Sequence, residues 1–298
     1  MDSINNILIA TLRMLPPILL AGMGGMISSR VGLLNMGLEG MMLIGSFVAV
    51  ITSYFTGQPY LALLITGISG GIFGLLFALF IIKFKANNIV VSVAVNMLAL
   101  GFTTYMLKIF FGVRGAFSDP KIIGLSIIHF PIPDKIPLFS AFNNHSILVY
   151  ISLILVIFMQ YFMYHTPAGL RMRATGQHDM AVTTAGGNVK AIRYTAIMVS
   201  GILCGLGGAH LSIGHLSMYT DNMTNGRGFI AMAAAVFGKN TPIGTFLGAL
   251  LFSFTDAVTM KIQTGGFPPL LVQMIPYVLT LITLLVVAIQ TKRREKTQ

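Results

Sequence analysis

Residues 60–82 read YLALLITGISGGIFGLLFALFII, an apolar run that contains no charged side chain. About 20 such residues in a helix are enough to cross the hydrocarbon of a bilayer. Runs of comparable length recur along the chain, so we predict a bundle of helices embedded in a membrane. The other runs lie at 6–28, 37–56, 89–111, 146–164, 194–215, 243–262 and 268–290.

The composition excludes an ordinary soluble domain. Of the 298 residues, 55% are hydrophobic and 9% are charged, and the mean hydropathy is +0.84. A soluble domain carries charge on roughly a quarter of its residues. We therefore expect residues 1–298 to form a single transmembrane domain with an all-α fold. Asp2 precedes the first run and Arg13 interrupts it, a pattern that predicts no cleaved signal peptide.

Two glycine-containing stretches interrupt the regular pattern of spans. Residues 228–238 are too few to cross a bilayer and end at the turn sequence KNTP (239–242), so we predict a half-helix or re-entrant segment there. The stretch 24–37, with Arg30 and Asn35, is similarly broken. With these pieces the bundle has about nine to ten membrane segments. Broken segments of this kind are typical of transporters, with the substrate path between them.

The distribution of basic residues predicts the orientation of the chain. Nineteen Lys and Arg against eight Asp and Glu give a net charge of +11. The basic residues lie mostly beside apolar runs, which favours membrane topology over nucleic-acid binding. We predict that the loop 165–193, the residues after 290 and the pair Lys83 and Lys85 are cytoplasmic. The side of the N-terminus stays open, because the sequence does not decide whether the stretch 24–37 crosses.

Two polar residues lie at predicted membrane depth near the start of the second run. Asn35 and Glu39 are four residues apart, which places them on one face of a helix if the backbone is regular there. A carboxylate inside a bilayer is costly without a partner or water, so Glu39 is a candidate for the substrate pathway. The alternative is an interfacial Glu39 that caps a helix or pairs with Arg30.

The short segment near residue 230 supplies two more pathway candidates, Arg227 and Phe229. Arg227 stands at the predicted start of that helix, where free backbone amides attract electron-rich groups. An arginine that only closes a helix corner is the competing interpretation. For Asp256 the sequence favours an interfacial role, since Lys261 and the end of the span are near.

The sequence predicts no metal site and no disulfide. Cys204 is the only cysteine and lies within an apolar helical pattern. His210 and His215 share a segment but have no acidic or cysteine partner in the sequence, so they are poor metal ligands. The glycines of the same segment, Gly201, Gly205, Gly207 and Gly208, predict tight helix packing.

The loop between the fifth and sixth runs is longer than a plain turn requires. Residues 179–185 can form a short helix that ends at Gly186 and Gly187. A short surface helix between two spans can act as a lever. The competing interpretation is an ordinary solvated loop.

Three motifs in this order resemble ATP-binding-cassette (ABC) permeases of the branched-chain amino acid and ribose type. They are NMGLEGMML (35–43), TPAGLR (166–171) and GRGFIAMAA (226–234). The resemblance covers nearly the full length, and within that group the chain is similar to the nucleoside, guanosine-type branch. It implies a multi-pass permease subunit of the bacterial plasma membrane with a cytoplasmic C-terminus.

The resemblance also implies partners that this chain lacks. A second permease subunit, often a longer relative, would complete the pore. A cytoplasmic ATPase would use the ATP, and an external lipoprotein would deliver the nucleoside. The chain itself has no phosphate-binding loop of the Gly-x-x-x-x-Gly-Lys-Ser/Thr type, so no cofactor is expected on it.

The resemblance further implies that the loop helix is the coupling helix that contacts the ATPase. The residues it assigns to this role are Gly176, Gln177, His178, Asp179, Met180, Ala181, Gly186 and Gly187.

Other functions compete with this interpretation. An ion-coupled secondary transporter would use Glu39 or Asp256 as its ion site. An ABC permease for sugars or branched-chain amino acids would share the same architecture. A membrane enzyme is disfavoured, because no cluster of base, nucleophile or metal ligands is visible at membrane depth.

Overall fold

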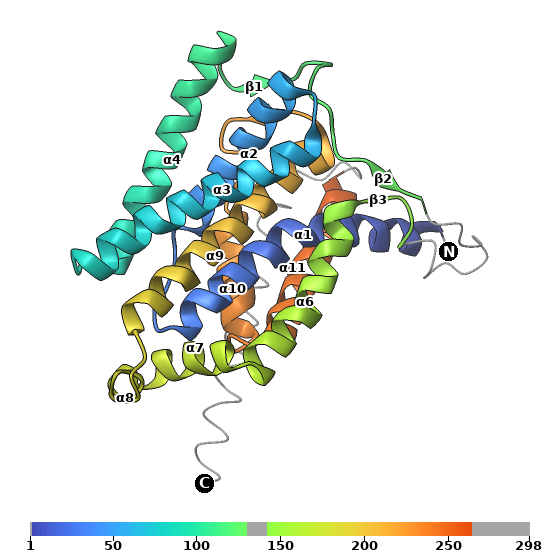
Figure 1. The fold of residues 1–298 in the computed structure, drawn as a ribbon. Helices are drawn as coiled ribbons and strands as arrows, with labels where there is room; N and C mark the ends of the chain where they lie inside the picture. The colour runs from blue at the N-terminus through green and yellow to red at the C-terminus, as the bar shows by residue number, and fades with distance from the viewer. Residues whose placement is uncertain (1, 130–141, 264–298) are drawn as a thin grey trace.

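The computed structural model describes residues 2–129 and 142–263, and within them it is a bundle of helices (Figure 1). Seven helices in these ranges are long and apolar enough to cross a membrane. They are α1 (Asp2–Arg30), α2 (Leu38–Thr56), α3 (Pro59–Ala78), α4 (Asn88–Phe111), α6 (Ile147–His165), α9 (Val189–Ala209) and α11 (Pro242–Gln263). The predicted all-α membrane bundle is confirmed. The predicted run 268–290 lies outside the described residues.

Short elements connect and extend the long helices. Wide π-helical turns continue α3 as η1 (Leu79–Lys83) and α9 as η2 (His210–Leu216). Three shorter helices follow the predicted breaks: α7 (Pro167–Gln177), α8 (Asp179–Thr184) and α10 (Arg227–Phe237). The predicted half-helix at 228–238 is therefore present as α10, and the predicted loop helix at 179–185 is present as α8.

Two small antiparallel pairs of strands close one end of the bundle. Strand β1 (Ala116–Phe117) pairs with β4 (Tyr219–Thr220), and β2 (Ile127–Ile128) pairs with β3 (His145–Ser146). In Figure 1 the α7–α8 corner, residues 167–187, lies at the lower left, whereas both strand pairs lie on the upper and right sides. The described chain thus has a corner end and a strand end.

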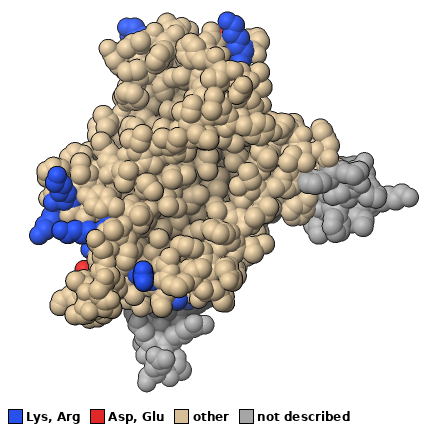
Figure 2. Space-filling model, in the orientation of Figure 1, with Lys and Arg blue, Asp and Glu red and all other residues tan. Residues whose placement is uncertain are grey.

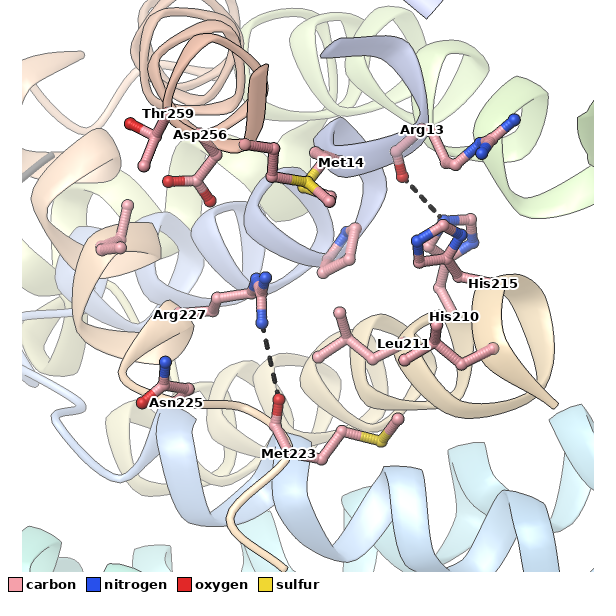
Figure 3. A pocket seen from close by; sticks show the side chains of 14 residues that line it. Arg13, Met14, His210, Leu211, His215, Met223, Asn225, Arg227, Asp256 and Thr259 are labelled. Atoms are coloured by element: carbon pink, nitrogen blue, oxygen red, sulfur yellow. Dashed lines mark hydrogen bonds between the residues drawn. The ribbon is translucent and has the colours of Figure 1, made fainter. Parts of the chain in front are cut away.

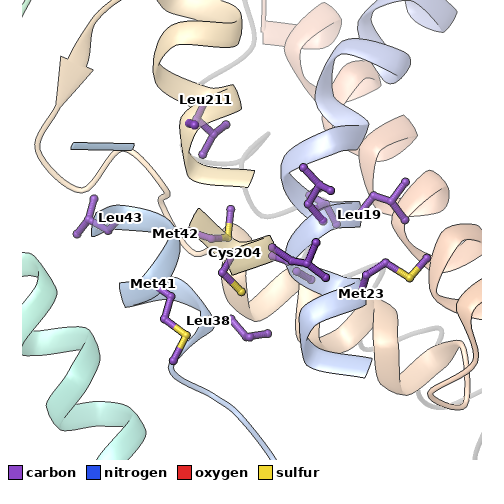
Figure 4. Packing of buried hydrophobic residues seen from close by; sticks show 14 of the residues in the cluster. Leu19, Met23, Leu38, Met41, Met42, Leu43, Cys204 and Leu211 are labelled. Atoms are coloured by element: carbon purple, nitrogen blue, oxygen red, sulfur yellow. The ribbon is translucent and has the colours of Figure 1, made fainter. Parts of the chain in front are cut away.

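Helices α1, α2 and α9 form the centre of the bundle, where most of their side chains are buried. Figure 4 shows this core, to which each of the three helices and the turn η2 contribute apolar side chains. The labelled members are Leu19, Met23, Leu38, Met41, Met42, Leu43, Cys204 and Leu211. Burial of such side chains from water or from loosely packed lipid stabilises the arrangement through close packing.

Helices α3 and α9 approach so closely that their backbones touch through glycines. A Cβ atom built on Gly70 would lie 2.3 Å from the carbonyl oxygen of Gly201, and one on Gly201 would lie 2.2 Å from that of Gly70. On the other side, a Cβ on Gly208 would lie 1.9 Å from the carbonyl oxygen of Met42 in α2. Only glycine fits at such contacts, so the predicted tight packing of this glycine face is confirmed.

The outer surface of the bundle is apolar. Large hydrophobic side chains stand exposed on α3, α4 and α6, such as Ile68, Met97 and Ile157. Figure 2 shows few charges on the middle of the visible face, with Lys and Arg gathered at its upper and lower-left ends. This distribution suits a protein whose middle faces lipid and whose ends face water.

Candidate functional site

A cavity of about 370 Å³ lies between α1, η2, α10 and α11 (Figure 3). Its wall carries polar side chains from separate parts of the chain. These are Arg13, His210, His215, Asn225, Arg227, Asp256 and Thr259. Because apolar side chains fill the rest of the wall, the cavity combines a few convergent polar groups with an apolar lining, as binding sites for small molecules do.

The turn before α10 places Arg227 at the cavity. Asn225 and Gly226 both adopt positive φ angles, 43° and 82°, and the helix begins directly after them at Arg227. The Arg227 guanidinium donates a hydrogen bond of 3.5 Å to the carbonyl oxygen of Met223. Figure 3 shows Arg227 on the cavity wall with Asp256 of α11 nearby. A guanidinium and a carboxylate therefore face one cavity between the helices.

His210 of η2 also lines the cavity. It is fully buried, with its Nε2 atom 3.1 Å from the carbonyl oxygen of Arg13 and its Nδ1 atom 3.2 Å from the Ser146 hydroxyl. A carbonyl oxygen only accepts, so Nε2 carries the proton and Nδ1 accepts from Ser146. No group of three His, Cys, Asp or Glu residues that could hold a metal ion occurs within 2–129 and 142–263.

Glu39 binds the N-terminus of α10 from the first turn of α2. Its Oε1 accepts from the Thr224 hydroxyl at 2.5 Å and from the Gly226 amide at 2.8 Å. Its Oε2 accepts from the Gly228 amide at 2.6 Å. Free amides at a helix N-terminus and the helix dipole both favour a carboxylate. Of the two roles that the sequence left open for Glu39, the structure therefore shows the helix cap. Its hydrogen-bond partners at the start of α10 are 185 or more residues away in sequence.

Asn35 and Glu39 do not share a helical face, because the backbone between them is not a regular helix. Helix α2 begins at Leu38, and Asn35 lies before it in a turn, where its Oδ1 accepts from the Gly37 amide at 3.0 Å. The Asn35 side chain is fully buried and donates to the Ser200 hydroxyl at 3.2 Å. Such local side-chain bonding favours turns over helix, which explains the late start of α2.

Arg30 has partners other than Glu39. Its Nε donates to the carbonyl oxygen of Asn240, and its Nη2 donates to the carbonyl oxygen of Lys239 at 3.3 Å. Both acceptors directly follow the C-terminal end of α10. The same Nη2 lies 3.4 Å from the Tyr164 hydroxyl. Arg30 and Glu39 thus hold opposite ends of one short helix.

The α7–α8 corner lies away from the cavity. Helix α8 is surface-exposed, with 67% of Met180 accessible, and it ends at Thr184, two residues before Gly186, which has a φ of 78°. Asp179 forms an ion pair of 3.4 Å with Arg193 of α9. Gly176 packs so closely on the end of α1 that a Cβ atom there would lie 2.2 Å from the carbonyl oxygen of Arg30.

Comparison with known proteins gives the family. A family model described as the permease component of the branched-chain amino acid transport system matches residues 7–284. The chain belongs to this permease family. The resemblance expected from the three motifs is therefore confirmed.

Individual relatives of the permease are ABC transporter proteins. The guanosine ABC transporter permease protein NupQ of Bacillus subtilis (strain 168) is 39% identical, over 92% of this chain and 89% of NupQ. The nucleoside ABC transporter permease protein NupC of Lactococcus lactis subsp. cremoris (strain MG1363) is 32% identical, over 95% and 93%. The glucose-type permease protein TsgC13 of Haloferax volcanii is 33% identical, over 86% and 77%.

Bacillus subtilis and Lactococcus lactis each have a second permease protein that also matches this chain. These are the guanosine ABC transporter permease protein NupP and the nucleoside ABC transporter permease protein NupB. Relatives of the permease therefore come in pairs. The chain is a multi-pass permease component of an ABC transport system of the cell membrane, with a second permease as its expected companion.

The cavity of the permease includes one of the four pathway residues predicted from sequence. Arg227 lines it, whereas Asn35, Glu39 and Phe229 do not. Asp256, for which the sequence favoured the interface, lies on the cavity wall. The sequence did not predict Arg13, His210, His215, Asn225 and Thr259 as pathway residues. Of these, only Asn225 carried a usable signal, because it lies two residues before Arg227, at the predicted start of the short helix.

Proposed function

We propose that this chain is the pore-forming permease subunit of an ATP-driven nucleoside importer in a bacterial plasma membrane. A cytoplasmic ATPase and an external lipoprotein that delivers nucleoside complete the transporter. The names of the two bacterial relatives support the nucleoside class. The observation that carries the proposal is a cavity between membrane helices that presents Arg227 and Asp256 together.

The chemistry of the cavity suits a nucleoside better than a sugar. Its volume of about 370 Å³ falls within the range of about 300–1,000 Å³ typical of small-molecule sites. Met14, Leu211 and Ile230 supply apolar surface for the flat face of a base. Arg227 donates and Asp256 accepts hydrogen bonds, as the edge of a base and the ribose hydroxyls require. A hexose has hydroxyl groups around its whole ring and no planar aromatic ring, so it matches this apolar surface less well than a base does.

The α7–α8 corner is proposed as the surface that contacts the ATPase. It includes the residues expected from the resemblance, Gly176–Ala181 with Gly186 and Gly187. The corner and the first turns of α9 are basic, with Arg171, Arg173, Lys190 and Arg193, which favours a cytoplasmic position. The residues after 290 are assigned to the same side on the same ground. The chain itself holds no ATP in this proposal.

Competition of substrates for uptake tests the proposed class. In cells that depend on this transporter, uptake of labelled guanosine is expected to fall with excess unlabelled nucleosides. Free bases, ribose, glucose and leucine are expected to compete weakly, because each lacks either the base or the sugar. Strong inhibition by glucose or leucine, with little effect of nucleosides, would contradict the nucleoside assignment.

A further inference from the structure

Helix α10 is held at both ends by Arg30 and Glu39, the first and last residues of one short segment, 30–39. At its N-terminus the Glu39 carboxylate accepts the amides of Gly226 and Gly228. Just past its C-terminus the Arg30 guanidinium binds the carbonyl oxygens of Lys239 and Asn240. Hydrogen bonds in which one partner is charged are shorter and stronger than neutral ones. The two ends of α10 are therefore tied to the end of α1 and the start of α2.

The backbone around this clamp leaves little freedom. Lys239 and Asn240 both adopt left-handed conformations, with φ of 53° and 51°, which non-glycine residues rarely adopt. These conformations direct the two carbonyl groups to Arg30. At the other end, a Cβ atom on Gly228 would lie 2.5 Å from the backbone nitrogen of Glu39. A shift of segment 30–39 therefore displaces α10 as well.

The α7–α8 corner and the start of α9 contact the same segment. A Cβ atom on Gly176 would lie 2.2 Å from the Arg30 carbonyl oxygen and 3.0 Å from the Gly32 nitrogen. Arg193, which pairs with Asp179 of α8, donates to the carbonyl oxygen of Val31 at 3.3 Å. The ion pair is partly exposed and contributes little, so the close backbone contact at Gly176 is the stronger link.

We propose that Arg30 and Glu39 form a two-ended clamp that transmits displacement of the α7–α8 corner to α10, and so to Arg227 at the cavity. Arg227 is the first residue of α10 and lines the cavity, whereas Arg30 and Glu39 do not. Both clamp residues are positioning residues that act through α10. This assignment rests on the proposed function, because it requires that an ATPase moves the corner.

Coupling between ATP hydrolysis and uptake tests the clamp directly. The assembled transporter, with its second permease, ATPase and binding protein, is reconstituted in liposomes with Glu39→Gln or Arg30→Gln. In Glu39→Gln the side-chain NH2 group replaces one carboxylate oxygen and faces a backbone N–H of α10, so one hydrogen bond of the cap is lost. The size and shape of the side chain stay nearly the same. Each variant is expected to hydrolyse ATP at nearly the wild-type rate, yet to import about tenfold less guanosine per ATP.

Asp221→Asn is the matched control. Asp221 also accepts a backbone amide, that of Gly115 at 3.1 Å, and a threonine hydroxyl, that of Thr104, but it lies at the strand end. It is expected to keep wild-type coupling. An unchanged ratio of uptake to hydrolysis in both clamp variants would overturn the clamp while leaving the proposed function intact. A wild-type complex without ATP-driven uptake would overturn both.

A distance measurement keeps the proposal testable where a clamp variant fails to fold. Spin labels at the exposed positions Phe229→Cys on α10 and Ile68→Cys on α3 are placed in a Cys204→Ala background. With the clamp intact, the distance between the labels is expected to change when the assembled transporter binds ATP. An unchanged distance would contradict a moving α10.

Discussion

A permease whose residues 179–187 are replaced by a glycine–serine linker of equal length is expected to lose ATP-driven nucleoside uptake entirely. The replaced residues form α8 and its glycine end, which stand exposed at the corner of the molecule. A flexible linker cannot transmit a push from the ATPase, because it has no fixed shape. Uptake into cells that carry the variant is the measurement.

The variant itself is expected to fold and insert. Few core contacts are lost, since Val182 is the one buried residue of α8 and the Asp179 ion pair is partly exposed. The amount of chain in the membrane and its co-purification with the second permease therefore serve as controls. Uptake at the wild-type rate in a correctly inserted variant would show that the corner has no coupling role.

Arg227→Ala is expected to have the second largest effect, on substrate affinity. The substitution removes a donor from the cavity wall and leaves Asp256 without the cation that faces it. Loss of a hydrogen bond to a charged group weakens binding by about 1.5–3 kcal/mol, which corresponds to about 10- to 150-fold. The KM of uptake for guanosine is expected to rise by that factor.

Val236→Ala on the same helix is the matched control. Val236 is near the other end of α10, is largely exposed and does not line the cavity. Its variant is expected to keep a KM close to the wild-type value. Equal rises in KM for both variants would mean that Arg227 acts through the stability of α10 and not through the substrate.

The membrane-spanning helices could be predicted because the length and composition of each apolar run determine them. Apolar runs such as 60–82 and 89–111 have the length and composition of membrane helices, and they correspond to α3 with η1 and to α4. The half-helix could be predicted for the same reason: the turn sequence after Gly238 stops an apolar run before it can span, and α10 ends at Phe237.

The candidate site could be predicted only in part, because tertiary packing assembles it. Arg13, His215, Arg227 and Asp256 come from four different elements, and no spacing rule connects them. The role of Glu39 depends on a partner helix some 190 residues away. Asn35 lies outside the helix because its side chain accepts a hydrogen bond from the Gly37 amide, and this local bond delays the start of α2 to Leu38.

Physical reasoning and resemblance contributed different parts of the functional prediction. Hydropathy, the broken segments and the charge pattern predicted a membrane transporter. The three motifs predicted the ABC permease family, which the match over residues 7–284 confirms. The nucleoside class, the ATPase contact and the external lipoprotein stay predictions, supported by the names of relatives and by the chemistry of the cavity.

We infer that helices in this chain form a passage driven by a motor on another polypeptide. The most direct test of this inference is uptake of labelled guanosine into liposomes that contain either the chain alone or the chain with the second permease, the ATPase and the binding protein. Uptake is expected only in the complete system and only with ATP. Accumulation of guanosine by the chain alone, driven by a proton or sodium gradient, would contradict the account.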